Sequence, residues 1–265
     1  MTGAGEKAPK LLFVKSAGKE MTQTVICLKW GTRYGPEYVN RLYSMVKRHT
    51  ERALRFICIT DDPSGIENGV EIMPMPAFTL PEFFRYRPFR RMFIWQEDFC
   101  GLSGNVLHFD LDLVVTGSID GFFDYEPDCA FVSAENWTQF GQSIANMSIF
   151  RFRIGSNPQL WSQFEANPMK AYDLYRNSQT YVSRNVNEMA FYPREWCLSF
   201  KHSLIPSWPL NLFVTPSLPQ GTKVVVFTGK PDPDEAIEGR WPWEHWYHVF
   251  YKHVRPTPWV AEHWR

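Results

Sequence analysis

Two aspartates one residue apart, Asp110 and Asp112, are the residues of this chain best suited to chemistry. They lie between two apolar runs, 106–109 and 113–115. A strand projects alternate side chains to the same side, so carboxylates at positions i and i+2 can converge on one point. Two like charges there repel each other unless a cation joins them, and Mn²⁺ and Mg²⁺ prefer oxygen ligands while keeping positions open for phosphates. The spacing predicts a metal-diphosphate site; the alternative is a pair of solvated loop aspartates.

Composition limits the classes of protein to which the chain can belong. Its 265 residues suffice for one large α/β domain or two small ones. The 28 Lys and Arg balance 28 Asp and Glu, so bulk charge does not attract nucleic acid and we expect no nucleic-acid partner. Five cysteines without CxxC spacing argue against zinc. Those in apolar runs, Cys27, Cys58 and Cys129, are expected to be buried in a protein of a reducing compartment.

No apolar run approaches the ~18 residues that a membrane span needs. The patch at 11–14 is too short for the core of a signal sequence. We therefore expect a soluble, cytoplasmic protein. The aromatic tail at 241–265 has three interpretations: packing on the core, which we favour, lining an acceptor groove, or peripheral contact with a membrane.

The chain begins with a β-α-β pattern. Apolar runs at 25–30 and 55–60 predict strands, and apolar residues at helical spacing predict a helix over 36–49 that starts at a proline. This order favours a parallel sheet, whose ligands bind beyond the carboxyl ends of the strands. We therefore expect Asp61 and Asp62, which follow the second strand, to lie near the first aspartate pair.

Further elements follow the same logic. We predict a short strand at 70–73, strands at 130–134, 147–152 and 223–227, and helices from about 88, at 157–164, at 179–191 and at 244–254. The arrangement is a polar extension over 1–24, one domain over 25–240 and the aromatic tail packed on it.

The segment 83–99 is rich in arginine and aromatic residues; of its arginines, Arg90 and Arg91 are the candidates to face a phosphate.

The segment 106–120, with His-Phe-Asp-Leu-Asp-Leu-Val-Val-Thr-Gly-Ser-Ile-Asp at its centre, resembles the DxD segment of GT-A fold glycosyltransferases. The resemblance is to family 8, the glycogenin-like and galactosyltransferase-like group and its bacterial relatives, and it runs over about 25–234. It implies a mostly parallel central sheet flanked by helices. It also implies that Asp110 and Asp112 hold Mn²⁺ or Mg²⁺.

Other segments carry the same resemblance. The family's nucleotide-binding start is matched by Lys29, Trp30, Thr32, Tyr34, Thr60, Asp61 and Asp62. Asn146 begins a strand similar to the one that faces the donor sugar, and Gln179 stands where the family often has an Asp-Gln pair. The segment 226–231 is similar to the late His-x-x-Gly…Lys-Pro motif, in which Gly229 and Lys230 match the residues that contact the diphosphate. The family's third metal ligand is replaced by Val226, which cannot bind a metal.

The reaction that this resemblance implies is retaining transfer of a hexose-like group from a nucleotide diphosphate sugar, expected to be UDP-linked. The acceptor would be a hydroxyl of a glycan, a lipid-linked glycan or a protein. Asp110, Asp112, Gln179 and Lys230 would carry the chemistry, because the metal and the lysine neutralise the leaving diphosphate.

Two alternatives remain open. The run at 110–114 also fits the D-x-D-x-[TV] motif of haloacid-dehalogenase-type phosphatases, with Asp110 as nucleophile and Asp112 as acid/base, although that motif usually follows the first strand. A catalytically degenerate nucleotide-sugar binding protein would explain Val226 and Ser178, which stands in place of the family's aspartate. A dinucleotide oxidoreductase is disfavoured, because no predicted strand is followed by GxGxxG.

Overall fold

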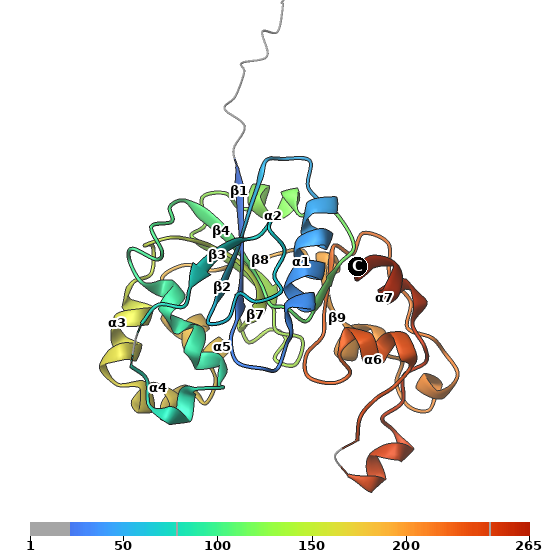
Figure 1. Cartoon of the computed structure of the whole chain (residues 1–265). Helices are drawn as coiled ribbons and strands as arrows, with labels where there is room; N and C mark the ends of the chain where they lie inside the picture. Colours follow the sequence, from blue (N-terminus) through green and yellow to red (C-terminus); the bar gives the residue numbers. More distant parts are fainter. Residues whose placement is uncertain (1–21, 78, 244) are drawn as a thin grey trace, which may run out of the picture.

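The computed structural model describes residues 22–77, 79–243 and 245–265 (Figure 1). Nearly all of the predicted extension over 1–24 lies outside these residues. Within the described part, the strands form a larger sheet in the order β3-β2-β1-β4-β7-β6-β8 and a smaller one in the order β5-β10-β9. The strands of the larger sheet are β1 (Gln23–Lys29), β2 (Leu54–Thr60), β3 (Glu71–Pro74), β4 (Asn105–Phe109), β6 (Phe131–Glu135), β7 (Ala145–Arg153) and β8 (Ala190–Phe191).

The larger sheet is mostly parallel, as predicted. Strands β1 to β4 run parallel to one another, and β6 runs parallel to β8. Strand β7 is antiparallel to both of its neighbours, β4 and β6. In the smaller sheet, β10 (Val224–Val226) pairs antiparallel with β5 (Leu113–Val115) and parallel with β9 (Cys197–Ser199).

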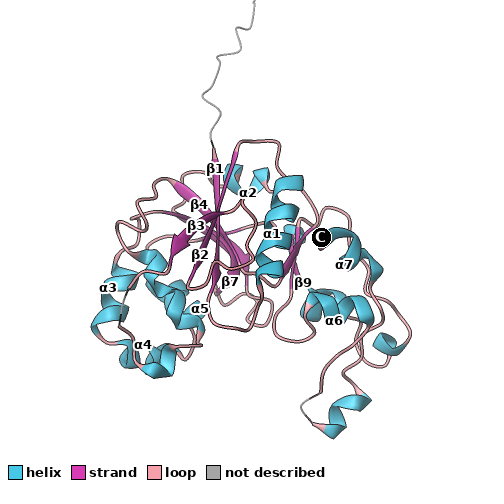
Figure 2. Cartoon of the chain, in the orientation of Figure 1, coloured by secondary structure: helices cyan, strands magenta, loops and turns pink. Residues whose placement is uncertain are grey.

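Helices flank the larger sheet on both sides (Figure 2). The α-helices are α1 (Pro36–Arg48), α2 (Asp120–Asp124), α3 (Gln159–Ala166), α4 (Pro168–Tyr175), α5 (Ser178–Asn185), α6 (Pro233–Glu238) and α7 (Pro258–His263). Short helical turns of other types are η1 (Glu82–Phe84), η2 (Pro88–Trp95), η3 (Arg194–Trp196), η4 (Phe200–Leu204), η5 (Leu210–Leu212) and η6 (Trp246–Phe250). The helix predicted from residue 88 is a 3₁₀ helix, η2.

The alternation of side chains along β1 divides the interior into two cores. Val25 and Cys27 pack with α1 on one face, whereas Ile26 and Leu28 pack with η2, α3 and α5 on the other. Strand period explains the division, because neighbouring side chains point to opposite faces. The three cysteines of the apolar runs are buried, as predicted.

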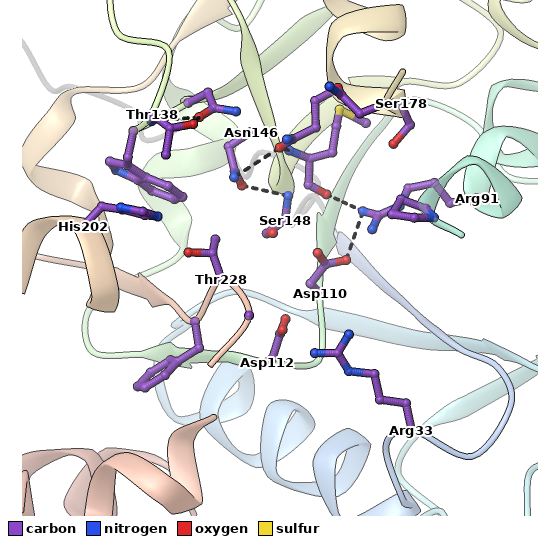
Figure 3. A pocket seen from close by; sticks show the side chains of 18 residues that line it. Arg33, Arg91, Asp110, Asp112, Thr138, Asn146, Ser148, Ser178, His202 and Thr228 are labelled. Atoms are coloured by element: carbon purple, nitrogen blue, oxygen red, sulfur yellow. Dashed lines mark hydrogen bonds and ion pairs between the residues drawn. The ribbon is translucent and has the colours of Figure 1, made fainter. Parts of the chain in front are cut away.

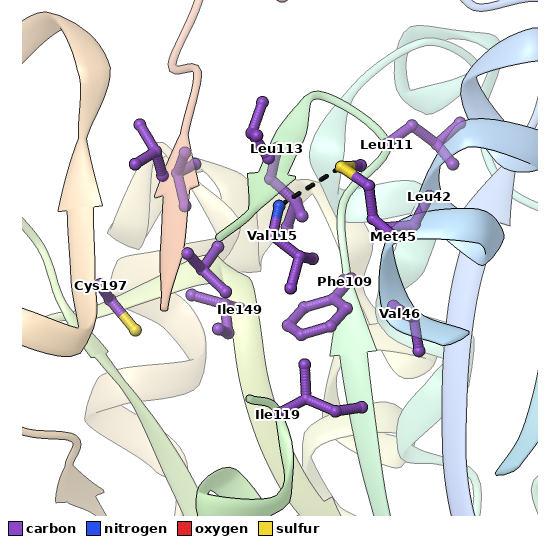
Figure 4. Close-up of a cluster of buried hydrophobic side chains, with 14 of the residues drawn as sticks. Leu42, Met45, Val46, Phe109, Leu111, Leu113, Val115, Ile119, Ile149 and Cys197 are labelled. Carbon is purple, nitrogen blue, oxygen red and sulfur yellow. Dashed lines mark hydrogen bonds between the residues drawn. The ribbon is translucent and has the colours of Figure 1, made fainter. Parts of the chain in front are cut away.

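The turn that carries the aspartate pair joins the two sheets. The Asp110 amide donates to the carbonyl of Ser148 in β7 at 2.8 Å, while the carbonyl of Asp112 accepts from the amide of Phe227, after β10, at 3.0 Å. Leu111, between the two, is 4% exposed and belongs to the core that α1 covers (Figure 4). This buried leucine anchors the turn and leaves both carboxylates on the opposite side.

The helix predicted over 179–191 is shorter than predicted and is corrected to α5, which ends at Asn185. Tertiary hydrogen bonds end it: the Gln159 side chain donates to the carbonyl of Asn185, and Asn157 accepts from the amide of Asn187. The chain is then extended and pairs with β6 as β8. The side chains of Asn157 and Gln159 thus bond backbone groups that a longer helix would use for its own hydrogen bonds.

The tail does not form the single helix predicted over 244–254. It has a 3₁₀ turn, η6, and then α7, which follows Pro256 and begins at Pro258, a residue suited to the first helical turn. Val260 and Trp264 are buried against the core, so this part packs on the domain, whereas Trp246 and Phe250 are exposed. No helix in the described ranges is long and apolar enough to cross a bilayer.

Candidate functional site

Two cavities meet at the aspartate pair. One has a volume of about 450 Å³ and lies at the end of β1, and the other has a volume of about 320 Å³ and lies over β7 and α5. Both are lined by Arg33, Pro88, Arg91, Asp110 and Asp112. A ligand that filled both cavities would therefore pass directly over the two carboxylates.

The larger cavity gathers residues from the loop after β1. It is lined by Lys29, Trp30, Thr32 and Tyr34, all predicted from the sequence, together with Tyr86 from the segment after η1. This tight turn requires Gly31, whose φ is +65° and whose added Cβ would lie 3.3 Å from the Tyr86 ring. Aromatic rings and a buried lysine give this cavity apolar faces with polar edges, which suit a nucleoside.

The smaller cavity is lined mainly by polar side chains (Figure 3). Here the structure brings together Asn146 and Gln179, two of the predicted site residues. The side-chain Nδ2 of Asn146 donates to Gln179 Oε1 at 3.3 Å, and the same oxygen accepts from the backbone amide of Met147 at 3.2 Å. Asn146 Oδ1 in turn accepts from the amide of Ser148 at 2.9 Å. Both side chains are thereby held in fixed orientations at the cavity wall.

Several residues of this cavity were not identified from the sequence as site residues. They are Arg33, Asn136, Trp137, Thr138, Ser148, Asn177, Ser178, His202 and Thr228. His202 lies in the π-helical turn η4, immediately after β9, and Thr228 lies just beyond β10. Thr228 belongs to the late motif at 226–231, whereas His202 reaches the site because β9 pairs with β10 next to the aspartate turn, which local sequence patterns do not reveal.

The electrostatics of the aspartate pair are unbalanced. Burial and the nearby charge of Asp110 raise the pKa of Asp112 to about 7, although Tyr34 and Arg33 oppose the rise. The Tyr34 hydroxyl donates to Asp112 Oδ2 at 2.9 Å. Arg91 donates to Asp110 at 3.1 Å and to the carbonyl of Met147 at 2.6 Å. The raised pKa means that the protein alone does not fully compensate the second negative charge.

The predicted cation-binding role fits this donor set in part. Two carboxylates line one cavity wall, and the charge of Asp112 is not fully compensated. Oxygen donors of this kind suit Mn²⁺ or Mg²⁺. Val226 is fully buried in β10 and supplies no ligand. Within the described residues, no cluster of three or more His, Cys, Asp or Glu side chains is arranged to hold a metal. The residues therefore fit a cation that takes its remaining ligands from water and substrate.

Five predicted residues line neither cavity. Thr60 is buried and donates to the carbonyl of Asp62 at 3.0 Å, and Asp61 is exposed and accepts from the amide of Gly31. The bond to Gly31 holds the loop after β1, which lines the larger cavity. Arg90 also lies outside both linings.

Lys230 is the fifth of these residues. Its ammonium lies 2.6 Å from Asp232 and 2.8 Å from Glu235, both of which are buried residues. Gly229, its neighbour, does line the smaller cavity, with φ of +78°. The structure thus brings the glycine of the late motif to the site and places its lysine in ion pairs beside it.

Comparison with known proteins rests on structure alone. No protein-family profile matches the chain, and no curated protein is detectably similar to it in sequence. Among solved structures, the galactosyltransferase LgtC, determined with donor and acceptor sugar analogues, superposes with a TM-score of 0.56 at 11% identity, over 80% of this chain and 89% of LgtC.

Two further glycosyltransferases superpose similarly. GlyE of Streptococcus pneumoniae does so with a TM-score of 0.53 at 14% identity, over 80% of this chain and 56% of GlyE. The bifunctional glycosyltransferase WbbM does so with a TM-score of 0.53 at 12% identity, over 91% of this chain and 51% of WbbM. The order of elements, the mostly parallel sheet and these superpositions together give the chain the GT-A fold of glycosyltransferases.

Proposed function

We propose that the protein is a metal-dependent, retaining glycosyltransferase that moves a sugar from a nucleotide diphosphate sugar, expected to be UDP-linked, to an acceptor hydroxyl. The observation that carries the proposal is the position of Asp110 and Asp112 on the wall shared by two cavities. The nucleoside would occupy the larger cavity, the sugar the smaller one, and the diphosphate the space between them. The GT-A fold supports this assignment.

In the proposed reaction, the bond between the sugar's anomeric carbon and the diphosphate oxygen breaks, and its electron pair stays on the diphosphate. The acceptor oxygen forms the new bond to that carbon and loses its proton to the departing phosphate oxygen. Asp110 and Asp112 would hold Mn²⁺ or Mg²⁺, which supplies positive charge to the diphosphate when bound. Asn146 and Gln179 would position the sugar.

The lining of the smaller cavity supports a retaining course. Among the described residues, Asp110 and Asp112 are the carboxylates that line it. Because both would bind the cation, neither is available as a nucleophile or as a base for the acceptor. A front-face route that uses the departing phosphate as base needs no further carboxylate, so the product would keep the anomeric configuration of the donor.

The acceptor hydroxyl would belong to a glycan, a lipid-linked glycan or a protein. The phosphatase alternative is not favoured, because Asp110 follows β4 rather than the first strand and Lys230 is held by two carboxylates. A nucleotide-sugar binding protein without transferase activity remains the second candidate, since Val226 removes one expected metal ligand.

Calorimetry and product analysis test the proposal together. Nucleotide sugars are first screened by thermal shift with and without Mn²⁺, because a ligand that binds the folded state raises the melting temperature. The best donor is then titrated by calorimetry and assayed for hydrolysis and transfer. We expect Mn²⁺-dependent binding and turnover, with loss of turnover by orders of magnitude in Asp112→Asn. Binding without transfer or hydrolysis would select the second candidate, and absence of binding to any nucleotide sugar would refute both.

A further inference from the structure

Arg33 and Arg91 line both cavities at the aspartate pair, Lys29 lines the larger cavity, and Lys230 lies outside both linings. Lys29 donates to the carbonyl of Asp62 at 3.1 Å. Arg91 forms an ion pair with Asp110 at 3.1 Å. Lys230 forms ion pairs with Asp232 and Glu235. The charge of each is therefore offset by a neighbouring carboxylate. A lysine held by two carboxylates would have to break these pairs to reach a phosphate.

Arg33 differs from Arg91 and Lys230. Within the described residues, Arg33 forms no ion pair at 4.0 Å or less, and its guanidinium lies 4.9 Å from the centroid of the Tyr34 ring. It lines both cavities, and its guanidinium extends toward Asp112 (Figure 3). It comes from the loop after β1, so it approaches the aspartate pair from the side opposite the smaller sheet.

The site also needs an additional positive charge. The expected third metal ligand is replaced by the buried Val226, so the cation would be held by two carboxylates only. A departing diphosphate carries more negative charge than one divalent ion so held can neutralise. A guanidinium presents a planar set of donors that matches phosphate oxygens in pairs.

We propose that Arg33 binds the β-phosphate of the nucleotide donor, in the position between the two cavities where the sequence led us to expect Lys230. The proposal rests on the function proposed above and names the residue that recognises the diphosphate. The Tyr34 ring holds the guanidinium in place, and the Tyr34 hydroxyl holds Asp112, so one short segment orients both the cationic and the anionic side of the diphosphate site.

The test compares nucleoside diphosphates with their monophosphates. UDP, GDP and ADP are titrated into the full-length protein by calorimetry with Mn²⁺ present, and the tightest binder is compared with its own monophosphate. Variants are Arg33→Ala and Arg33→Lys. Arg52→Ala is a matched control, because Arg52 is an arginine that pairs with Asp124 outside both cavity linings. Melting temperature and circular dichroism confirm that each variant is folded.

We expect Arg33→Ala to weaken diphosphate binding by about 10- to 100-fold, the range for a lost hydrogen bond to a charged group. Monophosphate binding should weaken by less than about threefold, because the β-phosphate is absent. Arg33→Lys should recover part of the loss, while Arg52→Ala should bind as the wild type does.

Two outcomes would overturn the proposal in distinguishable ways. If Arg33→Ala keeps wild-type affinity for the diphosphate, or loses affinity equally for both nucleotides, Arg33 does not bind the β-phosphate. Loss of binding in Asp112→Asn would show in that case that the proposed function still stands. If the wild-type protein binds none of the three diphosphates, the proposed function fails and the role of Arg33 fails with it.

Discussion

The Tyr34 hydroxyl donates a hydrogen bond to Asp112 Oδ2 at 2.9 Å. This bond links the loop after β1 to the turn after β4, two segments 78 residues apart in the chain. Because it stabilises the charged carboxylate, it opposes the burial that raises the pKa of Asp112. The tyrosine therefore helps to keep the aspartate in the form that a cation requires.

Tyr34→Phe should weaken Mn²⁺ binding by about tenfold, the lower end of the effect of losing a group that supports a metal ligand. Calorimetric titration of Mn²⁺ into the chelator-treated protein measures it. Tyr38→Phe is the matched control, because the Tyr38 ring packs against that of Tyr34, with centroids 4.7 Å apart, but its hydroxyl donates to Asp234 instead. Equal affinities in Tyr34→Phe and the wild type would argue against a metal role for Asp112.

Removal of the metal should abolish turnover. After exhaustive treatment with EDTA, we expect activity below about 1% of the starting value, because the charge of the leaving diphosphate is no longer neutralised. Addition of Mn²⁺ should restore it. Donor turnover that persists at full rate in EDTA would contradict the metal-dependent mechanism.

Gln179→Ala should lower kcat by about 10- to 100-fold, because the side chain that fixes Asn146 and the strand at Met147 is removed and the sugar loses its orientation. Steady-state kinetics with saturating donor measure this change. Gln142→Ala serves as control, since Gln142 is exposed and lies outside the cavity lining. An unchanged kcat would exclude Gln179 from positioning the reacting groups.

His108 should make stability fall in acid. It is fully buried and stacks on Phe150 at 4.6 Å; burial, opposed in part by Asp110, lowers its pKa to about 3. Below pH about 6.5, the His108 imidazole is therefore protonated in the unfolded chain but stays neutral in the folded chain. This contribution to stability is complete above pH about 6.5 and is lost as pH falls toward 3, at up to about 1.4 kcal/mol per pH unit.

Urea unfolding of the metal-free protein between pH 7.5 and 4 measures this slope. His108→Phe keeps the ring stacking and removes the titration. The slope of its free energy of unfolding against pH should therefore be smaller, by the contribution of about one proton. Parallel slopes for the two proteins would show that His108 is not the group responsible.

Arg151→Met should destabilise the fold by about 3–5 kcal/mol, the cost of breaking a buried polar network. The Arg151 side chain is fully buried and donates to the carbonyls of Phe122, Phe123, Tyr125, Glu126 and Cys129. The control is Arg153→Met, two residues along the same strand, where the exposed side chain donates to Pro127 and Asp128. Its cost should stay below about 1 kcal/mol, and a similar cost for both variants would contradict this account.

The parts of the site that the sequence predicted are those that local pattern determines. Asp110 and Asp112 follow an apolar strand, and the residues from Lys29 to Tyr34 follow another, so the parallel order of β1 and β4 brings them to one rim. The fold was predictable for the same reason, since the apolar runs correspond to the buried strands of the larger sheet.

The parts that were missed depend on long-range pairing. His202 reaches the cavity only because β9 and β10 pair next to the turn, which no local period encodes. The ion pairs of Lys230 did have a local signal. Asp232 and Glu235 form a capping box at the start of α6, and a lysine two residues before that cap lies within reach of both carboxylates.

The backbone of Asp110 is bonded to the larger sheet and that of Asp112 to the smaller one. An ion held by both side chains would therefore join the two sheets at this turn, in addition to the core that they share. The freedom of the two sheets to move relative to each other when the ion is absent would then govern how readily the nucleoside diphosphate product leaves.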